Sequence, residues 1–71
     1  MPQFQEVNFN SMIIGEMYYC FGIHGYYIGT FDHFLDTYTE AKMKRVRYIT
    51  NEIREINEVV VDNTYKIYRI I

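Results

Sequence analysis

The sequence is poor in the residues from which small domains build cross-links and metal sites. Cys20 is the single cysteine, and tryptophan is absent. A lone cysteine cannot form an intrachain disulfide and supplies no cysteine-based zinc site. We therefore expect a reducing, cytoplasmic setting, and neither a metal ion nor another cofactor.

Long apolar runs and a targeting segment are also missing. The longest apolar run falls far short of the ~18 residues of a membrane span. The N-terminus Met1–Glu6 lacks the basic region and apolar core of a signal peptide. A chain of 71 residues has room for one domain and none for the two halves of a dinucleotide-binding fold. We predict a single domain over residues 1–71, no membrane association and no enzymatic activity.

Lysine and arginine are absent from residues 1–41, which carry five acids: Glu6, Glu16, Asp32, Asp36 and Glu40. All seven basic residues lie in residues 42–71, beside four acids, so the halves carry −5 and +3. Two interpretations follow. The split can steer a charged partner, or the acids and bases can pair across a compact domain.

Two neighbouring segments, Glu16–Ile23 and Tyr26–Phe31, are rich in aromatic and β-branched residues. His24-Gly25 lies between them, and glycine can take the positive φ of a primed turn, so we predict a β-hairpin. Residues opposite each other share a face. We expect the core face to contain Met17, Tyr19, Phe21, Ile23, Tyr26, Ile28 and Thr30. The other face contains Tyr18, Cys20, Gly22, Tyr27, Gly29 and Phe31.

That second face is unusually aromatic for a surface that meets solvent. Tyr18, Cys20, Tyr27 and Phe31 would form an apolar patch of a size rarely left bare on a monomer. We expect a second copy of the chain to cover the patch in a homodimer, with the N-terminal segment as the other candidate cover.

Residues 37–58 have a pattern typical of an amphipathic helix. Thr37-Tyr38-Thr39-Glu40 matches a capping box. Apolar residues then recur at helical spacing: Tyr38, Ala41, Val46, Ile49, Ile53 and Ile56. We predict a helix of about five turns across the core face. Val59–Val61 fits either the helix end or a short strand.

Tyr65–Ile71 alternates between apolar and polar residues and predicts a closing strand. Phe4–Phe9 and Met12–Ile14 are candidate edge strands. The predicted fold class is α+β: a β-β-α-β domain with one helix on an antiparallel sheet, with or without an extra N-terminal strand.

Motifs of catalysis or ligation are weak. His24 and His33 have no recognised metal-ligand spacing with Asp32 or Asp36. Cys20 lies mid-strand, where a cysteine usually behaves as a small hydrophobe. No catalytic residues and no metal ligands are predicted.

One basic cluster lies at the start of the predicted helix: Lys42, Lys44, Arg45 and Arg47. Cations there oppose the helix dipole, which indicates that they serve a partner. With Tyr18, Tyr27 and Phe31 as a stacking platform, the cluster would bind nucleic acid directly. The acidic net charge opposes this interpretation, because phosphate contacts supply most non-specific affinity.

The order of hairpin, Gly-Thr-Phe-Asp (29–32), helix and Tyr-x-Ile-Tyr-x-Ile (65–70) resembles small bacteriophage proteins made early in infection to take over the host. The likeness spans residues 16–71. One protein of this kind is a DNA-mimicking inhibitor of the histone-like nucleoid protein HU. The resemblance implies location in the host cytoplasm and a DNA-binding host protein, HU among the candidates, as the target. The net charge of −2 is less acidic than a strong DNA mimic would have.

The predicted function is therefore that of a non-enzymatic inhibitor that occupies a host protein's basic nucleic-acid-binding surface. The contact residues would be the acids Glu6, Glu16, Asp32, Asp36 and Glu40, with Tyr18 and Tyr27 as rigid contact area. Direct nucleic-acid binding through the basic cluster and a structural homodimer are the two alternatives.

Overall fold

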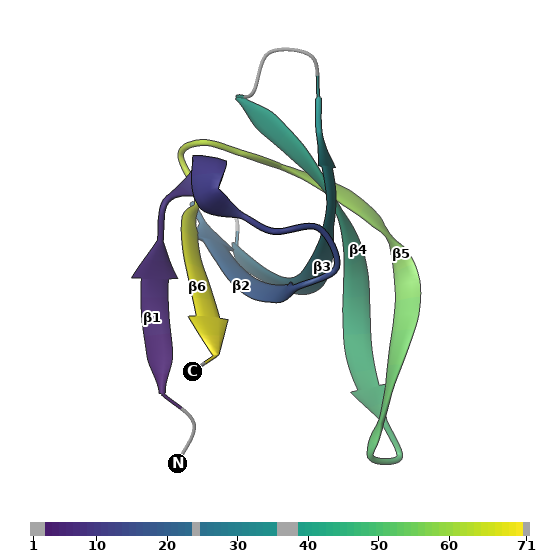
Figure 1. The fold of residues 1–71 in the computed structure, drawn as a ribbon. Helices are drawn as coiled ribbons and strands as arrows, with labels where there is room; N and C mark the ends of the chain where they lie inside the picture. The colour runs from purple at the N-terminus through teal and green to yellow at the C-terminus, as the bar shows by residue number, and fades with distance from the viewer. Residues whose placement is uncertain (1–2, 24, 36–38, 71) are drawn as a thin grey trace.

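The structure is a computed structural model that describes residues 3–23, 25–35 and 39–70, apart from the Tyr48 side chain. It contains six strands and one short 3-10 helix: β1 (Phe4–Val7), η1 (Phe9–Ser11), β2 (Met17–Gly22), β3 (Gly25–Phe34), β4 (Glu40–Ile49), β5 (Glu52–Asp62) and β6 (Lys66–Ile70). The strands form one antiparallel sheet in the order β1-β6-β2-β3-β4-β5. Figure 1 shows that this sheet is strongly curved.

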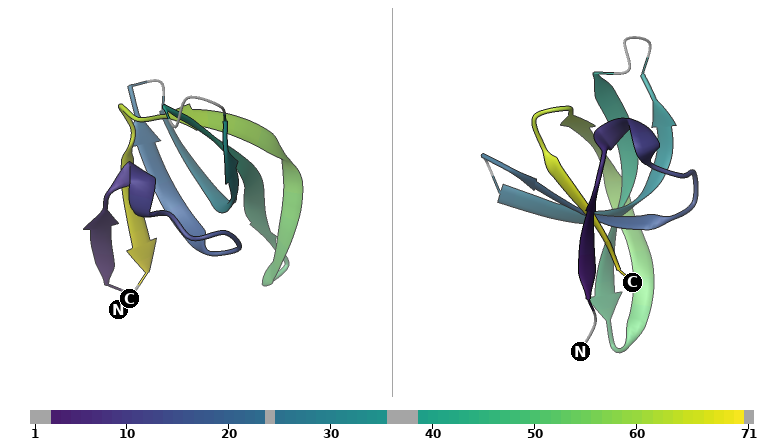
Figure 2. Two further views of the ribbon diagram at one scale, coloured as in Figure 1. Left: turned by 45° about the horizontal axis from the view of Figure 1, so that its top comes forward. Right: turned by 60° about the vertical axis from the view of Figure 1, so that its left-hand side comes forward.

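Strands β2 to β5 form a meander in which each strand lies beside its predecessor. The chain then returns, so that β6 pairs with β2, and β1 pairs with the far side of β6. The first and last strands are therefore neighbours, as the left view in Figure 2 shows. Strands β1 and β5 are the two edges of the sheet.

The predicted helix is wrong, and with it the α+β fold class. Most of its span forms the hairpin of β4 and β5, so the fold is an antiparallel all-β sheet. Thr50 and Asn51 have φ values of 52° and 65°, and a two-residue turn with two positive φ values joins twisted strands well. Thr37 and Tyr38 of the capping box lie outside the described residues. The helix in the likeness to phage proteins is accordingly absent.

The predicted hairpin of β2 and β3 is present in a different register. Gly22 pairs with Gly25 and Phe21 with Tyr26, whereas the sequence pattern places Phe21 opposite Ile28. The turn therefore begins at Ile23. The register differs from the predicted one by two residues. Because side chains alternate with a period of two, the strand residues of each predicted face stay together, whereas Ile23 lies in the turn.

The core, however, lies on the face predicted to be outside. Tyr18 and Phe31 are only 2% and 3% exposed, whereas Phe21 is 45% and Tyr26 is 61% exposed. The reason is the missing helix, which leaves the predicted core face uncovered. We call the face that packs on the core the inner face and the opposite one the outer face.

The core forms between the inner face and the segment that contains η1. Its buried side chains are Phe9, Met12, Tyr18, Cys20, Phe31, Ala41, Met43, Val61 and Ile67. Phe9 and Met12 come from η1 and the loop after it, which cross in front of the sheet in Figure 1. The Ile13 backbone N–H donates to the Tyr18 hydroxyl at 2.8 Å and holds this loop against β2. Of the two candidate N-terminal strands, residues 4–7 pair in the sheet and residues 12–14 do not.

Candidate binding surfaces on the two sheet faces

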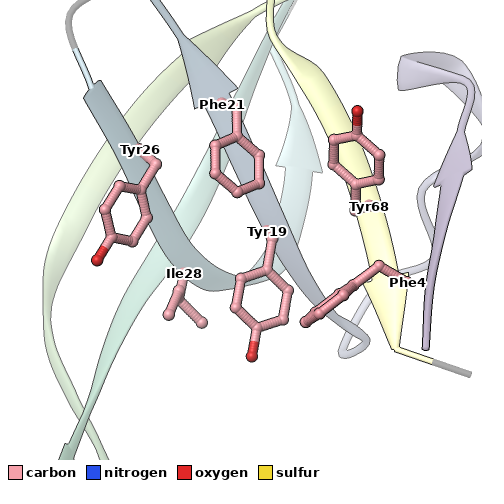
Figure 3. A pocket seen from close by; sticks show the side chains of 6 residues that line it. All are labelled: Phe4, Tyr19, Phe21, Tyr26, Ile28 and Tyr68. Atoms are coloured by element: carbon pink, nitrogen blue, oxygen red, sulfur yellow. The ribbon is translucent and has the colours of Figure 1, made fainter. Parts of the chain in front are cut away.

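A row of five aromatic side chains and one isoleucine crosses the outer face over four neighbouring strands. We call it the aromatic face, and it consists of Phe4, Tyr19, Phe21, Tyr26, Ile28 and Tyr68. Figure 3 shows these side chains side by side on β1, β6, β2 and β3. Strand register places them together, because Tyr19 lies opposite Ile28 on one side and opposite Tyr68 on the other.

Ring contacts order the aromatic face. The Phe4 ring meets the Tyr19 ring edge-on at 4.9 Å between centroids, and Phe21 stacks on Tyr26 at 5.7 Å. Phe21 also meets Tyr68 edge-on at 5.6 Å. The six side chains line an open apolar depression of about 530 Å³. Contiguous apolar surfaces of this kind mark interaction sites on small proteins.

Strand alternation sorts the charged residues of the strands between the two faces. The outer face carries six acids against three lysines, a charge of −3: Glu6, Asp32, Glu40, Glu55, Glu58 and Asp62 with Lys42, Lys44 and Lys66. The inner face carries four arginines against one acid, a charge of +3: Arg45, Arg47, Arg54 and Arg69 with Glu52. The charge split of the sequence therefore separates two faces rather than two halves.

The predicted acidic contact residues do not gather at one place in the structure. Glu6 lies opposite Tyr68 beside the aromatic face, Glu16 precedes β2, and Glu40 begins β4. The Asp32 carboxylate lies 2.5 Å from His33 Nδ1 and 4.0 Å from Lys44 Nζ. Asp36 lies outside the described residues. The structure thus brings Glu6 to the aromatic face and leaves Asp32 beside basic groups.

The two predicted tyrosine contacts belong to the inner face. Tyr18 packs inside the core and offers a partner almost no surface. Tyr27 is half-buried against the core. The apolar patch expected to be covered by a second copy is covered from within the chain, because Tyr18, Cys20 and Phe31 contact Phe9 and Met12 in one cluster. Sequence reasoning missed the aromatic face because it assigned those side chains to the core.

The predicted basic cluster is divided by the strand that carries it. Lys42 and Lys44 lie on the outer face, where Lys42 Nζ is 3.1 Å from Glu58 and Lys44 is 4.0 Å from Asp32. Arg45 and Arg47 lie on the inner face, where the Arg45 guanidinium sits 5.5 Å above the centre of the Tyr27 ring. The two lysines are thus paired with acids of neighbouring strands, whereas the two arginines lie together on the opposite face.

Buried and hydrogen-bonded groups have shifted pKa values. Burial raises the pKa of the Cys20 thiol to about 12, so this side chain stays protonated and is a poor nucleophile. Burial also raises the pKa of Tyr65, and hydrogen bonds from the Thr64 hydroxyl and backbone N–H lower the pKa of Asp62. Within residues 3–23, 25–35 and 39–70, no three His, Cys, Asp or Glu side chains converge on a possible metal position. None of the helices in this part of the chain is long and apolar enough to span a membrane.

Comparison with protein-family models, with curated proteins and with solved structures gives no match to this chain.

Proposed function

We propose that the protein is a non-enzymatic binding protein whose outer face covers a basic surface of a partner protein. The observation that carries the proposal is the aromatic face, a continuous apolar row of exposed and partly exposed side chains that lines a depression of about 530 Å³. Tyrosine and phenylalanine are enriched at the centres of protein interfaces, where they bury large areas at low conformational cost. The cytoplasm is the proposed location, because a lone free cysteine fits a reducing compartment.

The charge of the outer face supports a basic partner. Six acids outnumber three lysines there, and two of those lysines are already beside acids of neighbouring strands. Complementary charge mainly raises the association rate, while the buried aromatic anchors hold the complex together. A DNA-binding host protein fits this description, and HU is the candidate that the resemblance suggests. Imitation of DNA by the acids alone stays a prediction.

The test is capture of a partner from bacterial lysate by the tagged chain and by two double variants. Phe4→Ser with Phe21→Ser removes two exposed rings of the aromatic face. Ile14→Ser with Ile23→Ser is the matched control, because it removes two exposed apolar side chains that do not line the depression of the aromatic face. Purified HU is measured in parallel with the same three proteins.

We expect the aromatic-face variant to lose at least about tenfold of the affinity for a basic, DNA-binding partner, and the control variant to keep it within about twofold. Light scattering on the isolated chain is the second measurement. The proposal fails if both variants bind equally, or if the aromatic face proves to be occupied by a second copy of the chain.

A further inference from the structure

We propose that the inner face carries a binding site for single-stranded nucleic acid, formed by Arg45, Arg47 and Arg54 with Tyr27 and Tyr65. This site lies on the opposite face from the aromatic face and is independent of the function proposed above. Guanidinium groups contact phosphates in a forked geometry, and aromatic rings stack on bases. The same small area offers both. The Tyr27 and Tyr65 rings are partly buried against the core, and their remaining surface lies beside the arginines.

The arginines are arranged in a way that lowers the stability of the β4–β5 hairpin. Arg47 and Arg54 are directly opposite each other across β4 and β5. Like charges in that position destabilise a strand pair. Arg54 is paired with Glu52 at 3.2 Å, whereas neither Arg45 nor Arg47 has an acidic partner within the described residues. An anionic ligand would relieve this repulsion, which is our reason for assigning a ligand to the site.

Aromatic rings continue the site toward β6. The Arg45 guanidinium lies over Tyr27, and the Tyr27 ring stacks on Tyr65 with 6.4 Å between centroids. Gly22 makes room for this stack, because a Cβ at that position would lie 2.6 Å from the Tyr65 ring. A guanidinium and two nearly parallel rings thus lie in one line, so a base that stacks on Tyr27 takes the place of the Arg45 guanidinium, which then turns to the phosphate.

The site also has an opening. Pairing between β3 and β4 ends at Gly29 and Arg45, and beyond that point a cavity of about 290 Å³ lies between the two strands. Tyr27, Arg45 and Arg47 line this cavity from the inner face, and Tyr26, Ile28 and Val46 line it from the outer face. Figure 1 shows the hairpin of β4 and β5 projecting past the rest of the sheet, so that its inner face is not crossed by η1.

The chemistry favours a single strand over a duplex or an acidic peptide. In a duplex the base faces are stacked on one another and cannot reach Tyr27 or Tyr65, whereas single-stranded bases stack freely on aromatic side chains. An acidic peptide would use the arginines alone. The site therefore predicts that affinity depends on the rings as well as on the cations.

The experiment measures fluorescence anisotropy of labelled oligonucleotides of about 15 nucleotides, oligo(dT) and oligo(rU), titrated with the full chain. A DNA duplex of the same length and an oligo-glutamate peptide are the comparison ligands. Arg47→Gln with Arg54→Gln removes two charges from the site. Lys42→Gln with Lys44→Gln is the matched control, because it removes the same charge from the same hairpin on its outer face.

We expect the arginine variant to weaken binding of the single strand at least about tenfold, and the lysine variant to change it by less than about twofold. For three phosphate contacts the slope of log affinity against log salt is about −2, and it falls to about −0.7 in the arginine variant. Tyr27→Leu weakens binding about tenfold, whereas Tyr27→Phe keeps the ring and the affinity. Circular dichroism and thermal unfolding check that each variant is folded.

Four results would overturn the proposal. The first is that neither single strand binds saturably below about 100 μM, the upper range of ordinary non-specific affinity. The second is an equal loss of affinity in the two double variants, and the third is that the duplex or the oligo-glutamate binds as tightly as the single strand. The fourth is that Tyr27→Leu leaves the affinity of a folded protein unchanged. A difference between oligo(dT) and oligo(rU) identifies which nucleic acid the site prefers.

Discussion

At the residue scale, two glycines let the inner face pack closely. A Cβ on Gly29 would lie 2.7 Å from the backbone oxygen of Lys44 on the neighbouring strand. A Cβ on Gly22 would meet the ring of Tyr65, which is the movable end of a side chain. Both contacts are too short for real atoms, but the neighbour that must move is backbone in one case and a ring in the other.

We therefore predict that Gly29→Ala destabilises the protein more than Gly22→Ala. The alanine at position 29 forces β3 and β4 apart, at a cost of about 1–3 kcal/mol in the free energy of unfolding. Gly22→Ala is expected to cost less, because Tyr65 can swing away at the expense of its stack on Tyr27. Urea unfolding measures both variants. Equal costs, or a larger cost at position 22, would show that the strand spacing at Gly29 is not tight.

A second residue-scale prediction concerns Cys20, whose thiol has its pKa raised to about 12 by burial. The thiolate is the reactive form, so we expect a thiol reagent to label the native protein at pH 8 far more slowly than the urea-unfolded protein. Because the unfolded thiol has the lower pKa, the folded state holds the proton more tightly. This contribution to stability is complete below about pH 9 and declines as pH rises toward 12. Rapid native labelling would contradict the burial of Cys20.

At the scale of elements, the alternating strands were predictable and the longer hairpin was not. The hairpin of β2 and β3 and the closing strand β6 follow from period-two alternation and a glycine turn. In β5 the alternation is broken by a bulge, because Arg45 and Val46 pair with Asn57 and Glu55 and leave Ile56 extra. Ile53 and the bulged Ile56 are three residues apart in the sequence, and this separation matches the spacing of apolar residues on a helix.

The turn of that hairpin gives an element-scale prediction. Thr50 and Asn51 both have positive φ, which is unfavourable for a β-branched residue and tolerated by asparagine. Replacing the pair by Asn-Gly, through Thr50→Asn and Asn51→Gly, is expected to stabilise the protein by about 0.5–1 kcal/mol. Asn51→Val is the opposite control and should destabilise it. Thermal unfolding of the three proteins tests the sign, and a helix over these residues would predict loss of stability with Asn-Gly.

At the scale of the whole molecule, the sheet separates two surfaces of opposite charge. The sequence shows that acids and bases are unevenly distributed, but their sorting depends on which residues are strands. Because Glu40–Ile49 is a strand, the consecutive residues Lys44 and Arg45 within it point to opposite faces. The charged residues that share a face therefore differ from those predicted for the acidic site and for the basic site. Both differences arise because a hairpin stands where a helix was predicted.

The two edge strands of the sheet have features that disfavour pairing with another chain, which leaves the two faces as the binding surfaces. Strand β1 is only four residues long. Strand β5 is long and exposed, and it carries the bulge at Ile56 with Glu52, Glu55 and Glu58 along its length. Short edges, charges and bulges are the usual means by which proteins avoid pairing edge to edge. We expect partners to dock on the faces rather than to extend the sheet.

The last prediction tests whether the two faces act separately. The rings of Phe4 and Phe21 and the guanidiniums of Arg47 and Arg54 lie on opposite faces, and no ring contact or ion pair joins the two groups in the described residues. Substitutions at sites without shared partners act independently. Phe4→Ser with Phe21→Ser should abolish capture of the protein partner and leave the affinity for oligo(dT) within about twofold. Arg47→Gln with Arg54→Gln should do the reverse. If either double variant loses both activities while its thermal unfolding remains cooperative, the two surfaces form one site, and the separation of faces by charge has another cause.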